Sequence, residues 1–289
     1  MKIFLGNKLV DEKDAVVSVF DHGLLYGDGV FEGIRAYNGR VFLLEEHIDR
    51  LYDSAKAIAL EIPMSKEAMS QALIETCKAN DILDGYIRLV VTRGKGTLGL
   101  NPYLCEEAKV IIIAAKIQLY PQELYDNGLK IVTVGTVRNH TEAINPRIKS
   151  LNYLNNVMAK IEAINAGCME CLMLNTQGQV AEASGDNVFA IKDGVLTTPP
   201  SWCGALEGLT RNKVMELARN AGYKVRESVM ARYDLYIADE VFLTGTAAEV
   251  ISVVDIDKRM IGEGTPGKIT MELSNLYVEC ARSDGTQII

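Results

Sequence analysis

The chain has 289 residues, of which 48% are apolar and 24% are charged, and this is the composition of a globular protein with a sizeable core. The net charge of -8 and the pI near 5.1 argue against nucleic acid or an anionic membrane as the main partner, because either would favour a basic face. We therefore expect any phosphate or carboxylate ligand to be held by a few locally placed basic residues and backbone donors.

Hydropathy and cysteine usage indicate a cytoplasmic protein. No stretch approaches the apolar length of a membrane-spanning helix, and Met1–Lys8 is too short and too soon interrupted by charge for a signal peptide. The six cysteines lack the regular spacing of a disulfide framework. Cys168 and Cys171 form a C-x-x-C pair, but the three histidines are widely separated, so we predict no metal site and expect both thiols to pack as small apolar groups.

The first part of the chain is expected to form a small α+β domain. Period-two alternation predicts strands, and apolar residues that recur every three to four positions predict helices. Asn38-Gly39 gives a hairpin signal, and Ser65 is placed to open a helix. The predicted elements are strands at 16–20, 30–37, 86–92 and 110–115 and helices at 44–60 and 65–80.

Residues 120–128 contain proline and glycine, which break helices and strands, and we predict an interdomain linker there. A small N-terminal domain then covers residues 1–119, and a larger C-terminal domain covers residues 129–289. Gly167 and Gly222 stand where glycine ends helices. The elements predicted in the larger domain are strands at 129–134, around 172, 188 and 196, and at 241–243, and helices at 153–166, 210–221 and 268–281.

Lys149, Tyr153 and Glu182 are, in this order, the three groups that a pyridoxal phosphate enzyme needs. A lysine amine condenses with the cofactor aldehyde, and a tyrosine hydroxyl can hydrogen-bond the neighbouring ring oxygen. A carboxylate can hold a proton on the pyridine nitrogen, which keeps the ring an electron sink. Taken singly, each residue is as readily a solvated surface group, so the surrounding sequence has to carry the prediction.

That surrounding sequence resembles the class IV aminotransferases, the fold type IV family of pyridoxal phosphate enzymes. The motifs that carry the resemblance are Asp21–Arg35, Glu46–Leu51, Pro146–Tyr153, Val180–Asn187, Leu206–Arg211 and Thr244–Glu249. The resemblance implies a two-domain α+β fold with a β-barrel-like C-terminal domain, pyridoxal 5'-phosphate as cofactor, and a homodimer or higher homo-oligomer whose loops complete each other's pockets. It also implies that Lys149 both anchors the cofactor and moves the substrate α-proton.

Glycine-containing turns that lead into helices are candidates for the cofactor phosphate, because N–H groups at a helix start are anion donors. Two such turns are Gly208–Thr210 and Thr244–Glu249. Without the family, Thr210 and Thr246 read as ordinary helix caps, and an arginine on a helix reads as a solvated residue. The resemblance implies a phosphate site made of Leu209, Thr210, Thr246 and Arg50.

The substrate residues are expected to come from strands. Tyr86 and Arg88 are two residues apart, so they point to the same face of a strand and can line one wall of a pocket. The resemblance implies a substrate site of Tyr26, Phe31, Gly33, Tyr86, Arg88, Thr246 and Ala247. Within it we expect Arg88, with Tyr26 as a hydrogen-bonding neighbour, to receive the second carboxylate of glutamate, and the turn at Thr246 and Ala247 to receive the α-carboxylate.

Three relatives compete within the family: branched-chain aminotransferases, D-amino-acid aminotransferases and aminodeoxychorismate lyases. The small Gly33 and the pattern Tyr86-x-Arg88 look like the branched-chain type, and the loop Thr97–Pro102 lacks the arginine and histidine of the D-amino-acid type. We predict ping-pong transamination of L-leucine, isoleucine and valine with 2-oxoglutarate. The two relatives remain as alternatives, and a non-enzymatic binding protein is a third.

Overall fold

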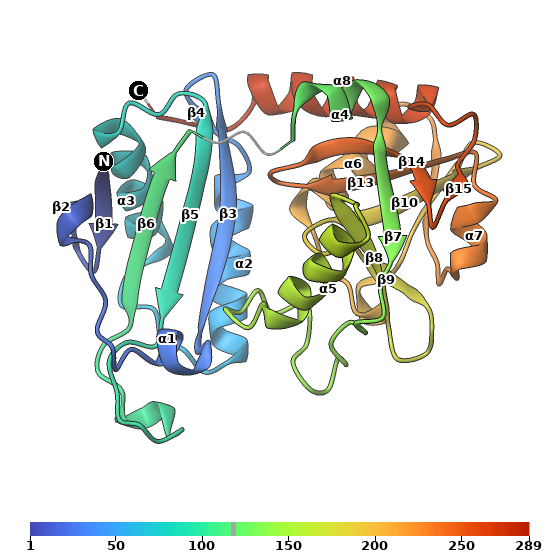
Figure 1. Cartoon of the computed structure of the whole chain (residues 1–289). Helices are drawn as coiled ribbons and strands as arrows, with labels where there is room; N and C mark the ends of the chain where they lie inside the picture. Colours follow the sequence, from blue (N-terminus) through green and yellow to red (C-terminus); the bar gives the residue numbers. More distant parts are fainter. Residues whose placement is uncertain (117–119, 289) are drawn as a thin grey trace. The chain divides into compact units, whose positions relative to one another are not determined.

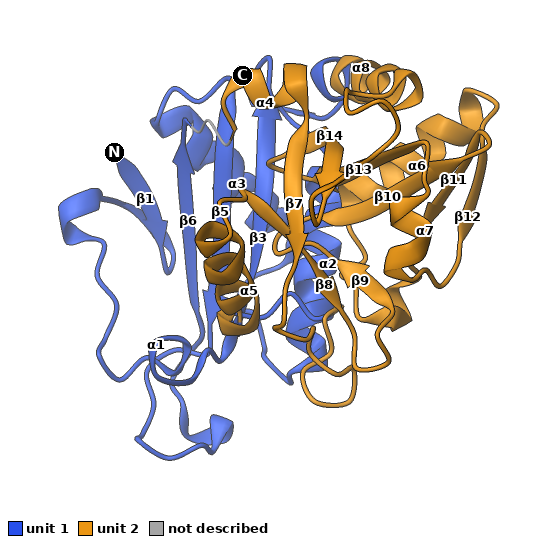
Figure 2. Ribbon diagram, turned by 45° about the vertical axis from the view of Figure 1, so that its right-hand side comes forward, with its two compact units in different colours: residues 1–117, 148–152, 281–289 blue, residues 118–147, 153–280 orange. Residues whose placement is uncertain are grey.

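The computed structural model describes residues 1–116 and 120–288 and divides into two compact units, coloured separately in Figure 2. Unit 1 consists of Met1–Ile117, Ile148–Asn152 and Ala281–Ile289, and unit 2 of Gln118–Arg147 and Tyr153–Cys280. Residue 119, where we predicted the end of the first domain, lies outside the described residues. Among the described residues, no helix has the length and apolar character needed to cross a membrane.

Unit 1 is built on a seven-stranded sheet in the order β16-β4-β3-β5-β6-β1-β2, in which neighbouring strands are antiparallel. Its strands are β1 (Lys2–Leu5), β2 (Lys8–Asp11), β3 (Gly29–Tyr37), β4 (Arg40–Val41), β5 (Gly85–Thr92), β6 (Lys109–Ala115) and β16 (Thr286–Gln287). Its helices are η1 (Glu12–Asp14), α1 (His22–Tyr26), α2 (Leu44–Ala57), α3 (Lys66–Ala79) and η2 (Pro102–Leu104).

Helices α2 and α3 cover one face of this sheet (Figure 1). Ser65 caps α3 as predicted, because its hydroxyl accepts the N–H of Ala68 at 3.2 Å. The apolar side of α2 packs against the even-numbered residues of β3, among them Val30 and Ile34. The odd-numbered residues of β3 therefore face away from the helices.

The predicted strand at 16–20 is wrong. Residues 15–18 are irregular and residues 19–20 form a turn. The side chains of Val16 and Val19 are 74% and 69% exposed, so the apolar alternation of this segment does not reflect burial within the chain. A strand needs a partner ladder as well as a pattern, and the sequence gives only the pattern.

Residues 148–152 belong to unit 1, although the predicted boundary placed them in the C-terminal domain. The N–H of Phe31 donates to the carbonyl of Lys149 at 2.9 Å, and the N–H of Leu151 donates to the carbonyl of Gly29 at 2.9 Å. Val30 and Ser150 form an isolated antiparallel bridge between these two bonds. The segment is thus held to the start of β3 by main-chain pairing over about 120 residues of sequence, which no local pattern encodes.

Unit 2 is built on a curled nine-stranded sheet in the order β12-β11-β10-β13-β14-β7-β8-β9, with β15 paired to β14 (Figure 1). Its strands are β7 (Leu129–Thr133), β8 (Glu170–Leu174), β9 (Val180–Glu182), β10 (Asn187–Lys192), β11 (Val195–Thr198), β12 (Lys224–Glu227), β13 (Glu240–Gly245), β14 (Glu249–Ile256) and β15 (Arg259–Met260). Its helices are α4 (Gln122–Asn127), α5 (Leu154–Asn165), η3 (Ser201–Cys203), α6 (Leu209–Asn220), α7 (Arg232–Tyr236) and α8 (Lys268–Ser283), of which the last three residues are assigned to unit 1. This sheet agrees with the predicted barrel-like C-terminal half of an α+β fold.

Part of the predicted linker is a helix. Pro121 is the N-cap of α4 and Gly128, with φ of +81°, follows its last residue, so the two residues that suggested a break delimit a short helix. Tyr125 fixes α4 to the rest of unit 2, since its hydroxyl donates to the carbonyl of Ala248 at 3.2 Å.

Candidate active site

The main chain of Lys149 is fixed on both sides within unit 1. Its carbonyl accepts the N–H of Phe31 at 2.9 Å, and its own N–H donates to the hydroxyl of Ser54 in α2 at 3.1 Å. The ammonium nitrogen lies 4.7 Å from the centroid of the Phe31 ring. The predicted catalytic amine is therefore directed to the face of the sheet that carries Phe31.

Four of the predicted substrate residues gather on that face. Gly33 of β3 pairs in register with Arg88 of β5, and the guanidinium carbon of Arg88 lies 4.8 Å from the ring centroid of Phe31 and 5.3 Å from that of Tyr86. A Cβ at residue 33 would lie 2.0 Å from the hydroxyl oxygen of Tyr86. Only glycine lets the tyrosine lie across β3, so Gly33, Phe31, Tyr86 and Arg88 form one packed surface beside Lys149.

Tyr26 has a different surrounding. It lies in α1, is 36% exposed, and donates its hydroxyl hydrogen to the carbonyl of Leu98. Its ring meets that of His22 edge-to-face at 5.0 Å. The structure thus ties Tyr26 to the loop that follows β5.

Arg50 is held by a carboxylate that the sequence did not single out. Its Nε and Nη2 donate to the two carboxylate oxygens of Glu32 at 2.8 Å each, and His47 Nδ1 lies 2.7 Å from Glu32 Oε2. Glu32 is fully buried, and burial acts to raise its pKa, but Arg50 and His47 lower it from 4.5 to about 2. Burial lowers the pKa of His47. An ionised carboxylate can only accept hydrogen bonds, so Nδ1 of His47 is the donor. A carboxylate inside an apolar strand was the sequence signal for this group.

In unit 2, Glu182 ends β9 and is buried. Arg138 Nε donates to its Oε1 at 2.8 Å, and the main-chain N–H of Leu206 donates to its Oε2 at 2.8 Å. Arg138 is itself oriented through Asn155, whose Oδ1 accepts from Nη1 at 3.2 Å. These contacts fix the position of the Glu182 carboxylate within unit 2. Arg138 stands in a loop and belongs to no motif that would mark it in the sequence.

Tyr153 is half-buried and is the N-cap residue of α5. It lies in unit 2, four residues after Lys149 of unit 1. The predicted pair of lysine and tyrosine is thus joined through the short connection where the chain passes from one unit to the other.

The start of α6 suits an anion, although not through the caps that the sequence suggested. Gly208 is the N-cap and offers no side chain, so the N–H groups of Leu209 and Thr210 point out of an open helix start. A Cβ at residue 208 would lie 2.0 Å from Asn187 Oδ1. Thr210 is the second helical residue, and its hydroxyl is 3.4 Å from that of Tyr277.

The reading of Thr246 as a helix cap is wrong. Residues 246–248 are the turn of the hairpin between β13 and β14, in which Gly245 pairs with Glu249. A Cβ at residue 245 would lie 1.9 Å from Asp186 Oδ1, so glycine is required for the close approach of this turn to Asp186. Thr246 and Ala247 are half-buried at the tip of the turn.

A profile of the family described as Amino-transferase class IV matches residues 29–256. The chain belongs to this family. A protein of Methanocaldococcus jannaschii, provisionally named a branched-chain-amino-acid aminotransferase, is 50% identical to this aminotransferase over 288 residues, which are 100% of this chain and 99% of that protein.

Solved structures agree with the family assignment. The crystal structure of the Escherichia coli branched-chain amino acid aminotransferase has a TM-score of 0.96 and 34% identity, and the match covers 100% of this chain and 99% of that one. The T.th. branched-chain amino acid aminotransferase complexed with N-(5'-phosphopyridoxyl)-L-glutamate has a TM-score of 0.92 and 38% identity, with 97% and 94% covered. The predicted family and the predicted α+β fold are confirmed.

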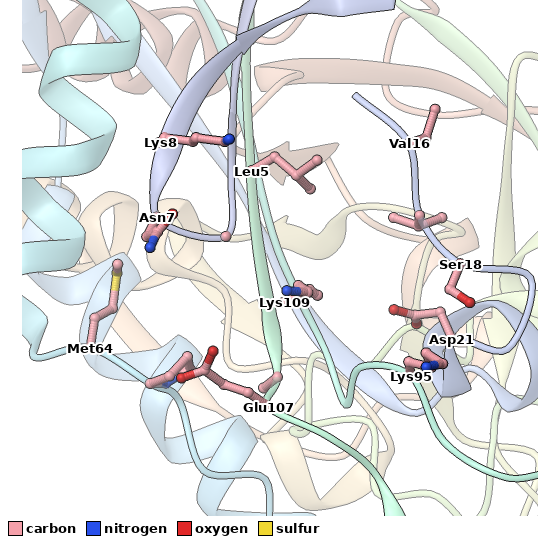
Figure 3. A pocket seen from close by; sticks show the side chains of 14 residues that line it. Leu5, Asn7, Lys8, Val16, Ser18, Asp21, Met64, Lys95, Glu107 and Lys109 are labelled. Atoms are coloured by element: carbon pink, nitrogen blue, oxygen red, sulfur yellow. The ribbon is translucent and has the colours of Figure 1, made fainter. Parts of the chain in front are cut away.

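This aminotransferase also has a surface pocket of about 470 Å³ within unit 1 (Figure 3). It is lined by residues of the first hairpin, by the segment at 16–18 and by residues at the start of β6, and its lining includes the charged residues Lys8, Asp21, Lys95, Glu107 and Lys109. Among the described residues, its lining includes none of the predicted site residues. The pocket is therefore separate from the surface around Lys149.

The Glu32 carboxylate should make folding sensitive to acid. Because its pKa is lower in the folded protein, the stability that it contributes is present above its ordinary pKa of 4.5 and is lost as the pH falls toward 2. The contribution is on the order of 3 kcal/mol. Urea unfolding between pH 5 and pH 2.5 should show a smaller loss of unfolding free energy for Glu32→Gln than for the unmodified protein. Glu46→Gln, an exposed neighbour in α2, should follow the unmodified curve, and parallel curves for all three would contradict the assignment.

Proposed function

We propose that this chain transfers the amino group of L-leucine, L-isoleucine or L-valine to 2-oxoglutarate, with pyridoxal 5'-phosphate as cofactor. The observation that carries the proposal is the surface beside Lys149, where Phe31 and Tyr86 supply apolar rings and Arg88 a charge. Such a surface suits an aliphatic side chain and also has a cation for a second carboxylate. The names of the similar proteins support the branched-chain assignment.

The residues present fit this cofactor. The open start of α6, with Leu209 and Thr210, and the hairpin turn at Thr246 are suited to a phosphate, and Arg50 would add charge. Glu182, whose carboxylate is positioned by Arg138, would accept a hydrogen bond from the protonated ring nitrogen. When bound, the cofactor withdraws electrons from the substrate α-carbon.

In this proposal Lys149 has two tasks. Its amine would anchor the cofactor covalently. Once freed by the substrate amine, the same nitrogen would take the substrate α-proton and return it to the cofactor carbon that carried the aldehyde. The main-chain bonds of Lys149 to Phe31 and Ser54 limit the positions that the amine can reach. Tyr153 would hold the ring oxygen next to the covalent bond.

The reaction would run in two half-reactions, because one pocket accepts the amino donor and the oxo acid in turn. We assign the α-carboxylate, common to all substrates, to the turn at Thr246 and Ala247. We assign the second carboxylate of glutamate to Arg88. The adduct of a phosphopyridoxyl group with L-glutamate in the similar T.th. enzyme supports glutamate as the second substrate.

The decisive experiment incubates the protein with each of the three amino acids and 2-oxoglutarate and measures the glutamate and the 2-oxo acid that are formed. Elimination products, or transfer from D-amino acids only, would contradict the proposal.

Lys149 should be the covalent anchor. Borohydride reduction of the protein loaded with pyridoxal phosphate, followed by peptide mapping, should label Lys149, and Lys149→Ala should abolish both label and turnover. Lys192→Ala, which changes an exposed lysine, should keep both. A label on any other lysine in the unmodified protein would refute this assignment.

Arg88 should separate the two half-reactions. Arg88→Gln should slow the half-reaction with glutamate or 2-oxoglutarate by about ten- to a hundredfold, because a charge-assisted contact is lost. The half-reaction with leucine should be affected much less. Single-turnover kinetics with each substrate would measure the difference, and equal losses would mean that Arg88 serves the α-carboxylate or the fold.

We also propose that the chain forms a homodimer or a higher homo-oligomer. The outer side of α5 exposes large apolar side chains at helical spacing: Leu154, Val157, Met158, Ile161 and Ile164. Unit 1 exposes a second group at 16–26 and 98–104, which includes Tyr26 and Leu98. Apolar patches of this extent usually mark an interface. We propose that a second copy covers them and that Tyr26 serves the pocket of that copy.

Charge on α5 should then disrupt the assembly. The unmodified protein should elute with a mass of at least twice the 31.7 kDa of one chain, as measured by chromatography with light scattering. Val157→Glu together with Ile161→Glu should shift it toward 31.7 kDa, because two buried charges oppose association. Asn165→Glu, at the exposed end of the same helix, should not. An unmodified protein of single-chain mass would rule the assembly out.

A further inference from the structure

Helix α2 holds two of the proposed active-site groups with a single side. His47, Arg50 and Ser54 are three and four residues apart, so they lie along one face of the helix. His47 and Arg50 contact Glu32 of β3, and Ser54 accepts the main-chain N–H of Lys149. All three contacts lie within unit 1.

The contact between Glu32 and Arg50 is bidentate and shielded. Nε and Nη2 of the guanidinium each donate to a carboxylate oxygen at 2.8 Å, while the side chain of Glu32 is 0% exposed and that of Arg50 is 13% exposed. A planar guanidinium held by two parallel hydrogen bonds cannot rotate, so Glu32 fixes the orientation of the whole guanidinium group of Arg50. His47 Nδ1 donates to the same carboxylate and removes its freedom to turn.

Burying a carboxylate such as Glu32 costs desolvation free energy, which its ion pair has to offset. Well-packed apolar residues of similar volume are often as stabilising as a buried ion pair, whereas an ion pair specifies one geometry. The surroundings of Glu32 in β3 are apolar, with Val30 and Ile34 on either side. Orientation of Arg50 is therefore a better account of Glu32 than stability.

We propose that Glu32, assisted by His47, is a positioning residue that aims the Arg50 guanidinium at the cofactor phosphate. This inference rests on the proposed function, in which Arg50 receives that phosphate. Glu32 and His47 touch neither substrate nor cofactor in this scheme and act only through Arg50. Ser54 does the corresponding task for the main chain of Lys149, so one rigid helix sets the spacing between the phosphate ligand and the covalent anchor.

The test compares two probes, pyridoxal 5'-phosphate and pyridoxal, which lacks the phosphate, by spectroscopic titration of the cofactor-free protein. Glu32→Gln should weaken binding of the phosphate form by about ten- to a hundredfold, because Arg50 keeps its charge but its guanidinium group is no longer held in one orientation. Binding of pyridoxal should change by no more than about twofold. Equal weakening of both probes would show a general structural role and overturn the proposal.

A double-mutant cycle makes the path through Arg50 explicit. Adding Glu32→Gln to Arg50→Met should weaken binding of the phosphate form by no more than about twofold beyond Arg50→Met alone. Additive losses would overturn the proposal, as would unchanged or tighter binding in Glu32→Gln. If Glu32→Gln fails to fold, Glu32→Asp, which keeps the charge but shortens its reach, should show the same selective loss for the phosphate form.

His47 offers a matched pair of variants. His47→Asn keeps an N–H donor near the place of Nδ1, and His47→Leu removes it. We expect the phosphate form to bind His47→Leu more weakly than His47→Asn, with pyridoxal unaffected by either. An unmodified protein that binds no pyridoxal phosphate would overturn the proposed function, and this inference with it. Normal binding that is insensitive to Glu32→Gln would overturn this inference alone.

Discussion

The pairing of residues 149–151 with the start of β3 is the constraint on which the rest of the site depends. Two main-chain hydrogen bonds, from Phe31 to Lys149 and from Leu151 to Gly29, fix where the reactive lysine enters unit 1. Because Phe31 lies on the face of β3 opposite α2, the pairing brings the amine to the same face as Arg88. Gly33 then completes that surface, since any side chain there would displace Tyr86.

Both units solve the same electrostatic problem in the same way. Each buries a glutamate and pairs it with an arginine: Glu32 with Arg50 in unit 1, and Glu182 with Arg138 in unit 2. A buried carboxylate without a partner would take up a proton or destabilise the fold. Pairing keeps the charge and also fixes its direction, and we infer that direction is what the chemistry needs from both pairs.

Several expectations failed for reasons that can be named. The segment at 16–20 has the alternation of a strand but remains exposed, because its apolar side chains find no cover within the chain. Pro121 and Gly128, which break helices and strands when they lie inside them, delimit one short helix, α4, within the predicted linker. Thr246 follows an apolar strand, and this position fits the start of a helix as well as the turn of a hairpin. The structure has the hairpin, because β14 pairs antiparallel with β13.

The sequence by itself determined the family and the order of most strands and helices, because helical periodicity and motifs are properties of neighbouring residues. It also marked Lys149, Tyr153 and Glu182 as candidate site residues. The tertiary structure decided which unit holds Lys149 and which partners hold Arg50 and Glu182. These contacts join residues that are 18 or more positions apart, and their existence depends on strand register and helix packing. The local sequence shows that a charged residue is present, but only the assembled fold places the residue of opposite charge beside it and shields both from water.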